Sequence, residues 1–275
     1  MPWFPDFANA AELAREATRD SAYADPAAEY LHALNDGEAR GLERAWPGEV
    51  VVLDPRAGEI RGHRPLRHFV RTNHAWFAAH DAAVETVATT RTDGRAVLEL
   101  LVTLTGDDGE SLSWPVAVVA ESSSEDSIVF RTYCSQLPVA GRRPVRPAIL
   151  APRDEHPGDV VAGYQTALDI GDVDAIVGAF GPDGYYREPI GPNREHRGAA
   201  ELRAFFTERF SDGGIGMQSC AVTDDGVRCA LEYNAIRWGS QTMVPQAGLG
   251  IYERGADGLL AAVRGYDDVL PPAGR

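Results

Sequence analysis

Two pairs of residues, each a tyrosine followed at a distance by a carboxylate, point to a catalytic site. Tyr164 precedes Glu188 by 24 positions, Tyr30 precedes Asp54 by the same 24, and a proline follows each carboxylate. A carboxylate at the end of a buried strand loses hydration and becomes a better base. A tyrosine facing the same cavity can donate a hydrogen bond to a developing enolate oxygen. Such a pair suits proton abstraction next to a carbonyl group, although a purely structural hydrogen bond in a core is the alternative.

Both pairs lie in an internal repeat that runs through the whole sequence. Tyr30 and Tyr164 are 134 positions apart, and matches further along keep an offset between 133 and 136. These matches include Arg61-Gly62 with Arg197-Gly198, Leu98-Glu99 with Leu231-Glu232, and Tyr133 with Tyr266. A repeat of this length corresponds to a whole domain. We therefore expect the 275 residues to form two similar domains.

Composition and charge exclude several classes of partner. The chain has 26 basic and 41 acidic residues, a net charge of −15, which argues against nucleic acids, polyanionic substrates and anionic membranes. No apolar run approaches the ~20 residues of a membrane span, and the first residues do not resemble a signal peptide. The three cysteines include no CxxC motif, which favours reduced thiols and a cytoplasmic location.

Each half of the sequence has the same expected order of elements: helix, helix, strand, helix and then four strands. In the first half, residues 26–34 and 65–79 carry helical apolar stripes, and residues 50–54 read as a strand. Helices followed by a run of strands predict an α+β domain with a mostly antiparallel sheet. We expect a leader helix at residues 1–22, a first domain at 23–138, a Pro/Arg-rich linker at 139–159 and a second domain at 160–272.

Both halves resemble a known family. The segments YQTALDIGDVDAIVGAF, REPIGP and RGAAELRAFF of the second half, and EYLHALNDGE, LDPRAG and IRGHRPLRHF of the first, are similar to bacterial ketosteroid isomerases. Those enzymes belong to the nuclear transport factor 2-like (NTF2-like, or cystatin-like) superfamily, together with the SnoaL-type polyketide cyclases of natural product biosynthesis. The resemblance covers about the first 50 residues of each domain.

The resemblance implies both a fold and a site. Each domain would be a cone-shaped cup, in which a curved, mostly antiparallel sheet wraps around helices and encloses a hydrophobic pocket. The outer sheet faces of the two cups would pack together as an intrachain pseudo-dimer, and a further homodimer of the chain is compatible with this. Tyr164 and Tyr30 match the oxyanion-binding tyrosine of the family, and Glu188 and Asp54 match its general base.

Two departures separate this sequence from a ketosteroid isomerase. The position of the second, protonated acid of the family falls on Ala117 in one half and on Ala247 or Leu249 in the other. Glu188 also has one methylene more than an aspartate, and a displacement of about 1 Å matters for a positioned base.

Glu99 and Glu232 occupy matched positions in the two repeats and are candidates for a second acid in each pocket. Strand alternation places Glu232 on one face with Ala230 and Asn234, which the family alignment turns into the cup. A glutamate among apolar neighbours needs a partner, and two carboxylates in one pocket can act as acid and base. The alternative is that these glutamates face solvent.

Further polar and aromatic residues are candidates for substrate contacts. They are Tyr186, Asn234, Gln246, Tyr266 and Asp268 in the second domain, and Asp81, Trp114 and Tyr133 in the first. Tyr133 and Tyr266 share a face with Ser135 and Asp268, respectively, and line either a pocket mouth or an interface. The histidines form no helical stripe and no HExxH motif occurs, so we expect neither a metal site nor a cofactor.

Three functions are compatible with these residues. The first is a cofactor-independent isomerase or cyclase acting on a hydrophobic, carbonyl-bearing small molecule, polyketide- or steroid-like. The second is an epoxide-opening cyclase of the polyether type or a related epoxide hydrolase, in which Asp54 works with Asp81 or Glu99. The third is a binding or accessory protein without chemistry.

Overall fold

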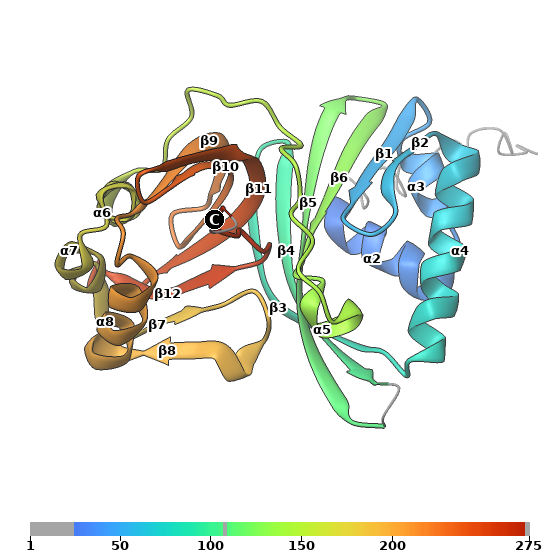
Figure 1. Cartoon of the computed structure of the whole chain (residues 1–275). Helices are drawn as coiled ribbons and strands as arrows, with labels where there is room; N and C mark the ends of the chain where they lie inside the picture. The colour runs from blue at the N-terminus through green and yellow to red at the C-terminus, as the bar shows by residue number, and fades with distance from the viewer. Residues whose placement is uncertain (1–24, 107–108, 273–275) are drawn as a thin grey trace, which may run out of the picture.

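The computed structural model describes residues 25–106 and 109–272, which form two α+β domains joined by a linker (Figure 1). The expected leader helix at residues 1–22 lies outside the described residues. The elements of the first domain are α2 (Pro26–Asp36), α3 (Arg40–Ala45), β1 (Glu49–Asp54), β2 (Gly58–Arg61), α4 (His63–Ala79), β3 (Ala83–Thr92), β4 (Arg95–Thr105), β5 (Ser111–Ser124) and β6 (Ser127–Tyr133).

The second domain repeats this order after a short helix, α5 (Leu137–Ala140), and an extended linker. Its elements are α6 (Asp159–Ile170), α7 (Val173–Gly178), β7 (Phe180–Arg187), a 3-10 turn at Pro192–Arg194, β8 (Glu195–Arg197), α8 (Gly198–Arg209), β9 (Ile215–Asp224), β10 (Arg228–Trp238), β11 (Gln241–Arg254) and β12 (Leu260–Gly265).

The two sheets have the same topology. Their strand orders are β2-β1-β6-β5-β4-β3 and β8-β7-β12-β11-β10-β9. The β1–β6 and β7–β12 pairs are parallel and the other pairs are antiparallel, so each open sheet is mixed but mostly antiparallel. The predicted fold class, two tandem α+β cups, is therefore confirmed.

The first helix of each cup ends at a glycine for the same reason. Gly37 after α2 and Gly171 after α6 adopt φ values of 71° and 75°, a left-handed conformation that other residues rarely take. Gly171 is constrained further, because a Cβ there would lie 2.7 Å from the backbone nitrogen of Gly214. These glycines turn the chain so that the helix lies across the concave face of its sheet.

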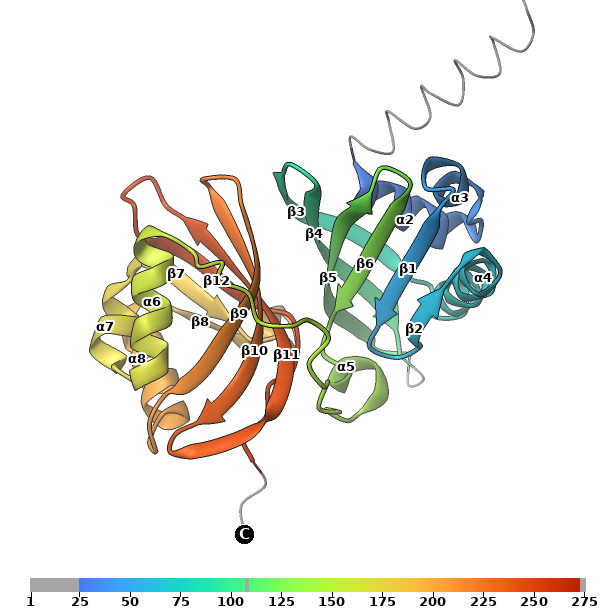
Figure 2. The ribbon, with the colours of Figure 1, turned by 90° about the horizontal axis from the view of Figure 1, so that it is seen from above.

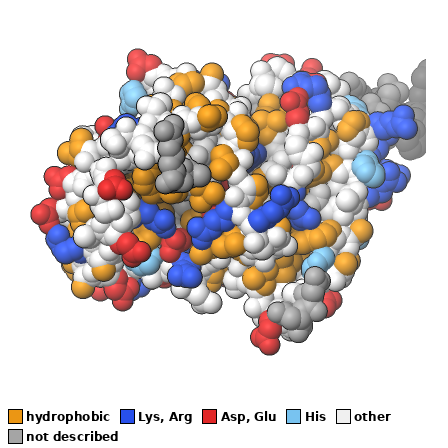
Figure 3. Space-filling model, viewed as in Figure 1, with side chains coloured by type: hydrophobic (Ala, Val, Ile, Leu, Met, Phe, Trp, Pro, Cys, Tyr) orange, Lys and Arg blue, Asp and Glu red, His pale blue; other side chains and the backbone are white. Residues whose placement is uncertain are grey.

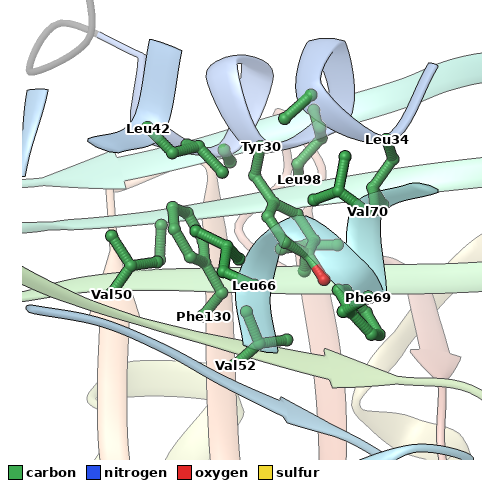
Figure 4. Close-up of a cluster of buried hydrophobic side chains, with 14 of the residues drawn as sticks. Tyr30, Leu34, Leu42, Val50, Val52, Leu66, Phe69, Val70, Leu98 and Phe130 are labelled. Atoms are coloured by element: carbon green, nitrogen blue, oxygen red, sulfur yellow. The ribbon is translucent and has the colours of Figure 1, made fainter. Parts of the chain in front are cut away.

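Each helix layer covers the inner face of its own sheet. In the first domain, Tyr30 of α2 stacks on Phe130 of β6 with ring centroids 4.5 Å apart, and both side chains are buried. Figure 4 shows Tyr30 among Leu34, Val70 and Phe69, inside the cup and not at its surface. The inner face and the helices thus form one core per domain.

The outer faces of the two sheets pack against each other, with the helices on the far sides of the molecule (Figures 1 and 2). A separate cluster of buried side chains joins them: Val97, Ala117, Val119, Tyr133, Ala230, Leu249, Ile251 and Tyr266. This is the expected intrachain pseudo-dimer. Basic side chains gather along the same junction on the face drawn in Figure 3. No helix within the described ranges is long and apolar enough to cross a membrane.

Candidate functional site

The cup of the second domain holds a cavity of about 120 Å³. Its walls are mainly aromatic: Tyr164, Tyr186, Phe206, Tyr233, Trp238 and Tyr252 come from the helices and the inner sheet face. Three carboxylates, Glu188, Asp267 and Asp268, also line it. An apolar cavity with a few converging polar groups is the usual form of a small-molecule site.

Two glycines of β11 make room for the tyrosines of this cavity. A Cβ on Gly248 would lie 2.5 Å from the ring of Tyr233, and one on Gly250 would lie 2.6 Å from the hydroxyl of Tyr252. Burial raises the pKa of both tyrosines well above the usual value. Their hydroxyls therefore stay protonated and can donate hydrogen bonds.

Glu188 follows the end of β7 and is held by basic side chains. Its Oε1 lies 3.2 Å from Nε2 of His196, and its Oε2 accepts from Nη2 of Arg209 at 3.3 Å. The Glu188 side chain is 11% exposed. Burial, with Glu188 as a negative neighbour, raises the pKa of Tyr186 to about 12. The negative charge of Glu188 is thus paired, while the tyrosine beside it remains a neutral donor.

Asp267 and Asp268 come after the last strand, separated from it by Tyr266, and line the same cavity. Burial raises the pKa of Asp267 to about 7; Arg146, 3.1 Å away, opposes this rise and the neighbouring Asp268 adds to it. Burial also raises the pKa of Asp268, against the hydrogen bond that Ser135 Oγ donates at 2.5 Å. A carboxyl that titrates near neutrality can both accept and donate a proton at physiological pH.

The cup of the first domain holds a smaller cavity of about 50 Å³, lined mostly by apolar side chains. Tyr30, Asp54, Trp114 and Cys134 are among its lining residues. Oδ1 of Asp54 accepts hydrogen bonds of 2.8 Å from the backbone amides of Arg56 and Ala57 in the following turn. Asp54 therefore has a structural role in the turn between β1 and β2.

The structure brings together seven of the residues expected to form the sites. Tyr164, Tyr186, Glu188 and Asp268 line the second cavity, and Tyr30, Asp54 and Trp114 line the first. Each predicted tyrosine and carboxylate therefore share one cup. Their catalytic roles stay predictions.

The placement of Glu99 and Glu232 in the cups was wrong, because both lie in the contact between the two sheets. Nε and Nη2 of Arg264 donate to Glu99 at 2.6 and 2.9 Å, and Arg131 holds Glu232 in the same way at 2.5 and 2.7 Å. The hydroxyls of Tyr266 and Tyr133 each add a bond of 2.6 Å to these respective glutamates. The glutamates do have partners, but each partner arginine belongs to the other domain. The interface alternative for Tyr133 and Tyr266 is the one that the structure shows.

Three other expected contact residues are also outside the cavities. Nδ2 of Asn234 donates to the backbone oxygen of Leu150 in the linker at 2.9 Å. Gln246 exchanges two hydrogen bonds with the backbone of Leu270. Asp81 lies in the turn after α4 with a φ of 47° and lines neither cavity. Strand alternation, combined with the family alignment, had placed Asn234 on the inner face.

Asp267 is the residue that the sequence analysis missed. Alternation singled out the face shared by Tyr266 and Asp268 and passed over Asp267, although Asp267 and Asp268 both line the cavity. The repeat offset of 133 aligns Asp267 with Cys134, an apolar-type residue, so the repeat gave no signal for it. Within residues 25–106 and 109–272, no group of three His, Cys, Asp or Glu side chains could hold a metal ion.

The sequence model of the SnoaL-like domain matches residues 161–263, which span the helices and sheet of the second cup. This match covers the second domain and less than half of the chain, so it shows that the second cup is similar to SnoaL-like domains. No curated protein matched the chain.

Solved structures similar to one domain of this chain include an NTF2-like protein of unknown function from Cytophaga hutchinsonii. It is 15% identical, with 42% of this chain and 95% of that one covered and a TM-score of 0.33. An LEH-like epoxide hydrolase from Mycobacterium tuberculosis is 21% identical, with 40% and 80% covered and a TM-score of 0.34. A putative polyketide cyclase from Sinorhizobium meliloti is 19% identical, with 40% and 94% covered and a TM-score of 0.32.

Proposed function

We propose that the second cup is the active site of a cofactor-independent isomerase or cyclase acting on a hydrophobic, carbonyl-bearing small molecule. The observation that carries this proposal is the buried carboxyl of Asp267 in the wall of an aromatic cavity, where burial raises its pKa. The apolar walls support a polyketide- or steroid-like substrate, because they favour a carbon skeleton with few polar groups.

In this mechanism Asp267 carries the proton. Its carboxylate removes a proton from the carbon next to the carbonyl, the electron pair of that C–H bond forms a C=C bond, and the C=O π pair moves onto the oxygen. A neutral tyrosine, Tyr164, Tyr186 or Tyr233, donates a hydrogen bond to the enolate oxygen. In an unsaturated ketone, return of the proton from Asp267 to the far carbon of the conjugated enolate gives isomerisation. Alternatively, the enolate carbon attacks a second carbonyl to close a ring, and Asp267 returns its proton to the alkoxide that forms. Glu188 contacts Arg209 and His196 and is not the base in this mechanism.

A second candidate function rests on the different environments of the two carboxylates. Glu188 is held by Arg209 and His196, whereas burial raises the pKa of Asp267 to about 7. A pair of this kind can open an epoxide: Asp267 gives its proton to the epoxide oxygen, and Glu188 takes the proton of the attacking hydroxyl. The epoxide C–O bond breaks as the new one forms.

Proton exchange tests the proposal without knowledge of the natural substrate. The protein is incubated in D₂O with a bicyclic ketone such as 2-tetralone, and incorporation of deuterium next to the carbonyl is followed by NMR. We expect exchange above the buffer rate, and a loss of at least ~10²-fold in Asp267→Asn, the usual scale of general-base assistance. Asp154→Asn is the control, because that linker side chain is fully exposed.

The outcomes separate the three functions. Deuterium exchange at the wild-type rate in Asp267→Asn would refute the role of Asp267 as the proton carrier. Absence of exchange, together with hydrolysis of a cyclic epoxide that needs both Asp267 and Glu188, would favour the epoxide-opening function. Binding of the ketone without either reaction would leave a binding protein.

A further inference from the structure

The guanidinium of Arg146, in the linker, connects the first domain to the cavity of the second. Its Nη1 donates to the backbone oxygen of Thr132 at 2.6 Å and to Oδ2 of Asp267 at 3.1 Å. Its Nη2 donates to the backbone oxygen of Leu53 at 3.1 Å. Leu53 and Thr132 are near the carboxyl ends of β1 and β6, so two carbonyls of the first domain fix the cation that Asp267 binds.

The rest of this arginine is also fixed in place. Its guanidinium lies over the ring of Tyr133, with the carbon 5.0 Å from the ring centroid, and the side chain is only 9% exposed. Its backbone oxygen accepts from the amide of Ala247 in β11 at 3.0 Å. Figure 2 shows the linker crossing from α5 to α6 along the junction of the two sheets. Arg146 is therefore held by both domains at once.

Asp268 is held across the same junction. It accepts the hydrogen bond from Ser135 of the first domain at 2.5 Å, and its Oδ1 lies 3.6 Å from Nε of the linker residue Arg143. The amide of Leu137 donates in turn to Ser135 Oγ at 3.1 Å. Both aspartates in the cavity wall of the second domain thus have their partners outside that domain.

We propose that Arg146 is a positioning residue for Asp267, so that the linker and the first domain complete the active site of the second. This inference rests on the proposed function of the second cup. It also gives the first domain a role: its own cup has Cys134 in place of Asp267, and its sheet instead supplies the carbonyls that fix Arg146.

Burial raises the pKa of Asp267, and the charge of Arg146 opposes that rise. The titratable groups that act on Asp267 are Arg146, the adjacent Asp268, Tyr233 of β10 and Cys134 of the first domain. Arg146 is the cation among them, while the charge of Asp268 acts in the opposite direction. A cation within 4–6 Å lowers a carboxyl pKa by about 1–3 units. Loss of Arg146 therefore makes Asp267 hold its proton to higher pH.

Carbon-13 NMR of carboxyl-labelled aspartate tests this directly in the full chain, with Asp267→Asn identifying the resonance. We expect the midpoint of Asp267 near pH 7, and a rise of at least about one pH unit, or tenfold in proton affinity, in Arg146→Met. Arg146→Lys keeps the charge but lacks the planar guanidinium that reaches three oxygens. The Asp267 midpoint in this variant should therefore lie between those of the wild type and Arg146→Met. Arg153→Met is the matched linker control, because Arg153 pairs with Glu121 and Glu155.

The results separate the positioning role from the proposed function. An unchanged Asp267 midpoint in both Arg146 variants, with the same midpoint in Arg153→Met, overturns the role of Arg146. A titration midpoint of Asp267 near pH 4 in the wild type overturns its role as proton carrier and the proposed function. Even then, an upward shift of that midpoint in Arg146→Met would support the contact between Arg146 and Asp267. If Arg146→Met does not fold, Arg146→Lys is the test. An unchanged midpoint of Asp267 in Arg146→Lys contradicts the idea that the three hydrogen bonds of Arg146 position Asp267.

Discussion

Replacement of Asp267 by asparagine should change how the stability of the protein depends on pH. Burial raises the pKa of this carboxyl from its ordinary 3.8 to about 7. One pKa unit corresponds to about 1.4 kcal/mol, so the difference amounts to about 4 kcal/mol. Between these two pH values the folded state keeps a proton that the unfolded state has released. The contribution of Asp267 is thus fully favourable below about pH 4 and is lost as the pH rises to about 7.

Other carboxylates work in the opposite direction, which is why the comparison must be between variants. Burial acts to raise the pKa values of Glu121 and Glu253, but neighbouring arginines lower them overall. The contribution of these two glutamates to the stability of the protein is therefore lost as the pH falls. Asparagine at position 267 has a similar shape but does not titrate. The free energy of unfolding of wild type minus that of Asp267→Asn should therefore fall by about 4 kcal/mol between pH 4 and 8.

Urea denaturation at pH steps from about 4 to 8, followed by tryptophan fluorescence and circular dichroism, measures this difference. Two probes are needed to show whether the two domains unfold together. Parallel stability curves for the two proteins would mean that Asp267 has an ordinary pKa. That result would refute the reasoning from burial, and with it the assignment of Asp267 as the proton carrier.

Three further substitutions, two of them with a matched control substitution, test the fold and the division of labour between the cups. Glu99→Ala leaves a buried arginine without its bidentate partner and should cost about 3 kcal/mol in unfolding free energy, whereas Glu59→Ala, in an exposed pair, should cost less than about 1 kcal/mol. Gly214→Ala places a Cβ against the backbone oxygen of Leu168 and should lower the melting temperature by several degrees. Gly163→Ala, in open space within α6, should be neutral or stabilising by about 0.5–1 kcal/mol. Asp54→Ala should cost about 1 kcal/mol through its turn hydrogen bonds, yet leave deuterium exchange unchanged; equal loss of exchange would move the site to the first cup.

The fold could be predicted because the same order of elements occurs twice in the sequence. The repeat offset and the helix-then-strand order gave the α+β class and the pairing of the cups. Short edge strands were missed: Gly58–Arg61 and Glu195–Arg197 have four and three residues, too few to show an alternating pattern. Their existence depends on pairing with β1 and β7, which only the folded chain provides.

The part of each site that could be predicted is the tyrosine and the carboxylate that the repeat marks. Tyr164 and Glu188 were expected in a common cup from their repeated spacing and from the family resemblance of the segments that contain them. Alternation failed for Glu99, because both faces of its sheet are buried, and such strands carry no polar face to orient them. The partner of this glutamate, Arg264, is 165 positions away in the other domain. Contacts such as that of Arg146 with Asp267 likewise depend on how the two cups dock, which no local pattern contains.

A crystal structure with a bound enolate mimic tests most directly where the chemistry takes place. 2-Naphthol is a suitable probe, because it is a flat, apolar phenol with one oxygen in the position of an enolate. We expect it in the second cup, with its rings between Phe206 and Tyr233 and its oxygen at hydrogen-bonding distance from Asp267. Occupation of the first cup alone, or an oxygen directed away from Asp267 and the tyrosines in the second, would contradict the proposed site.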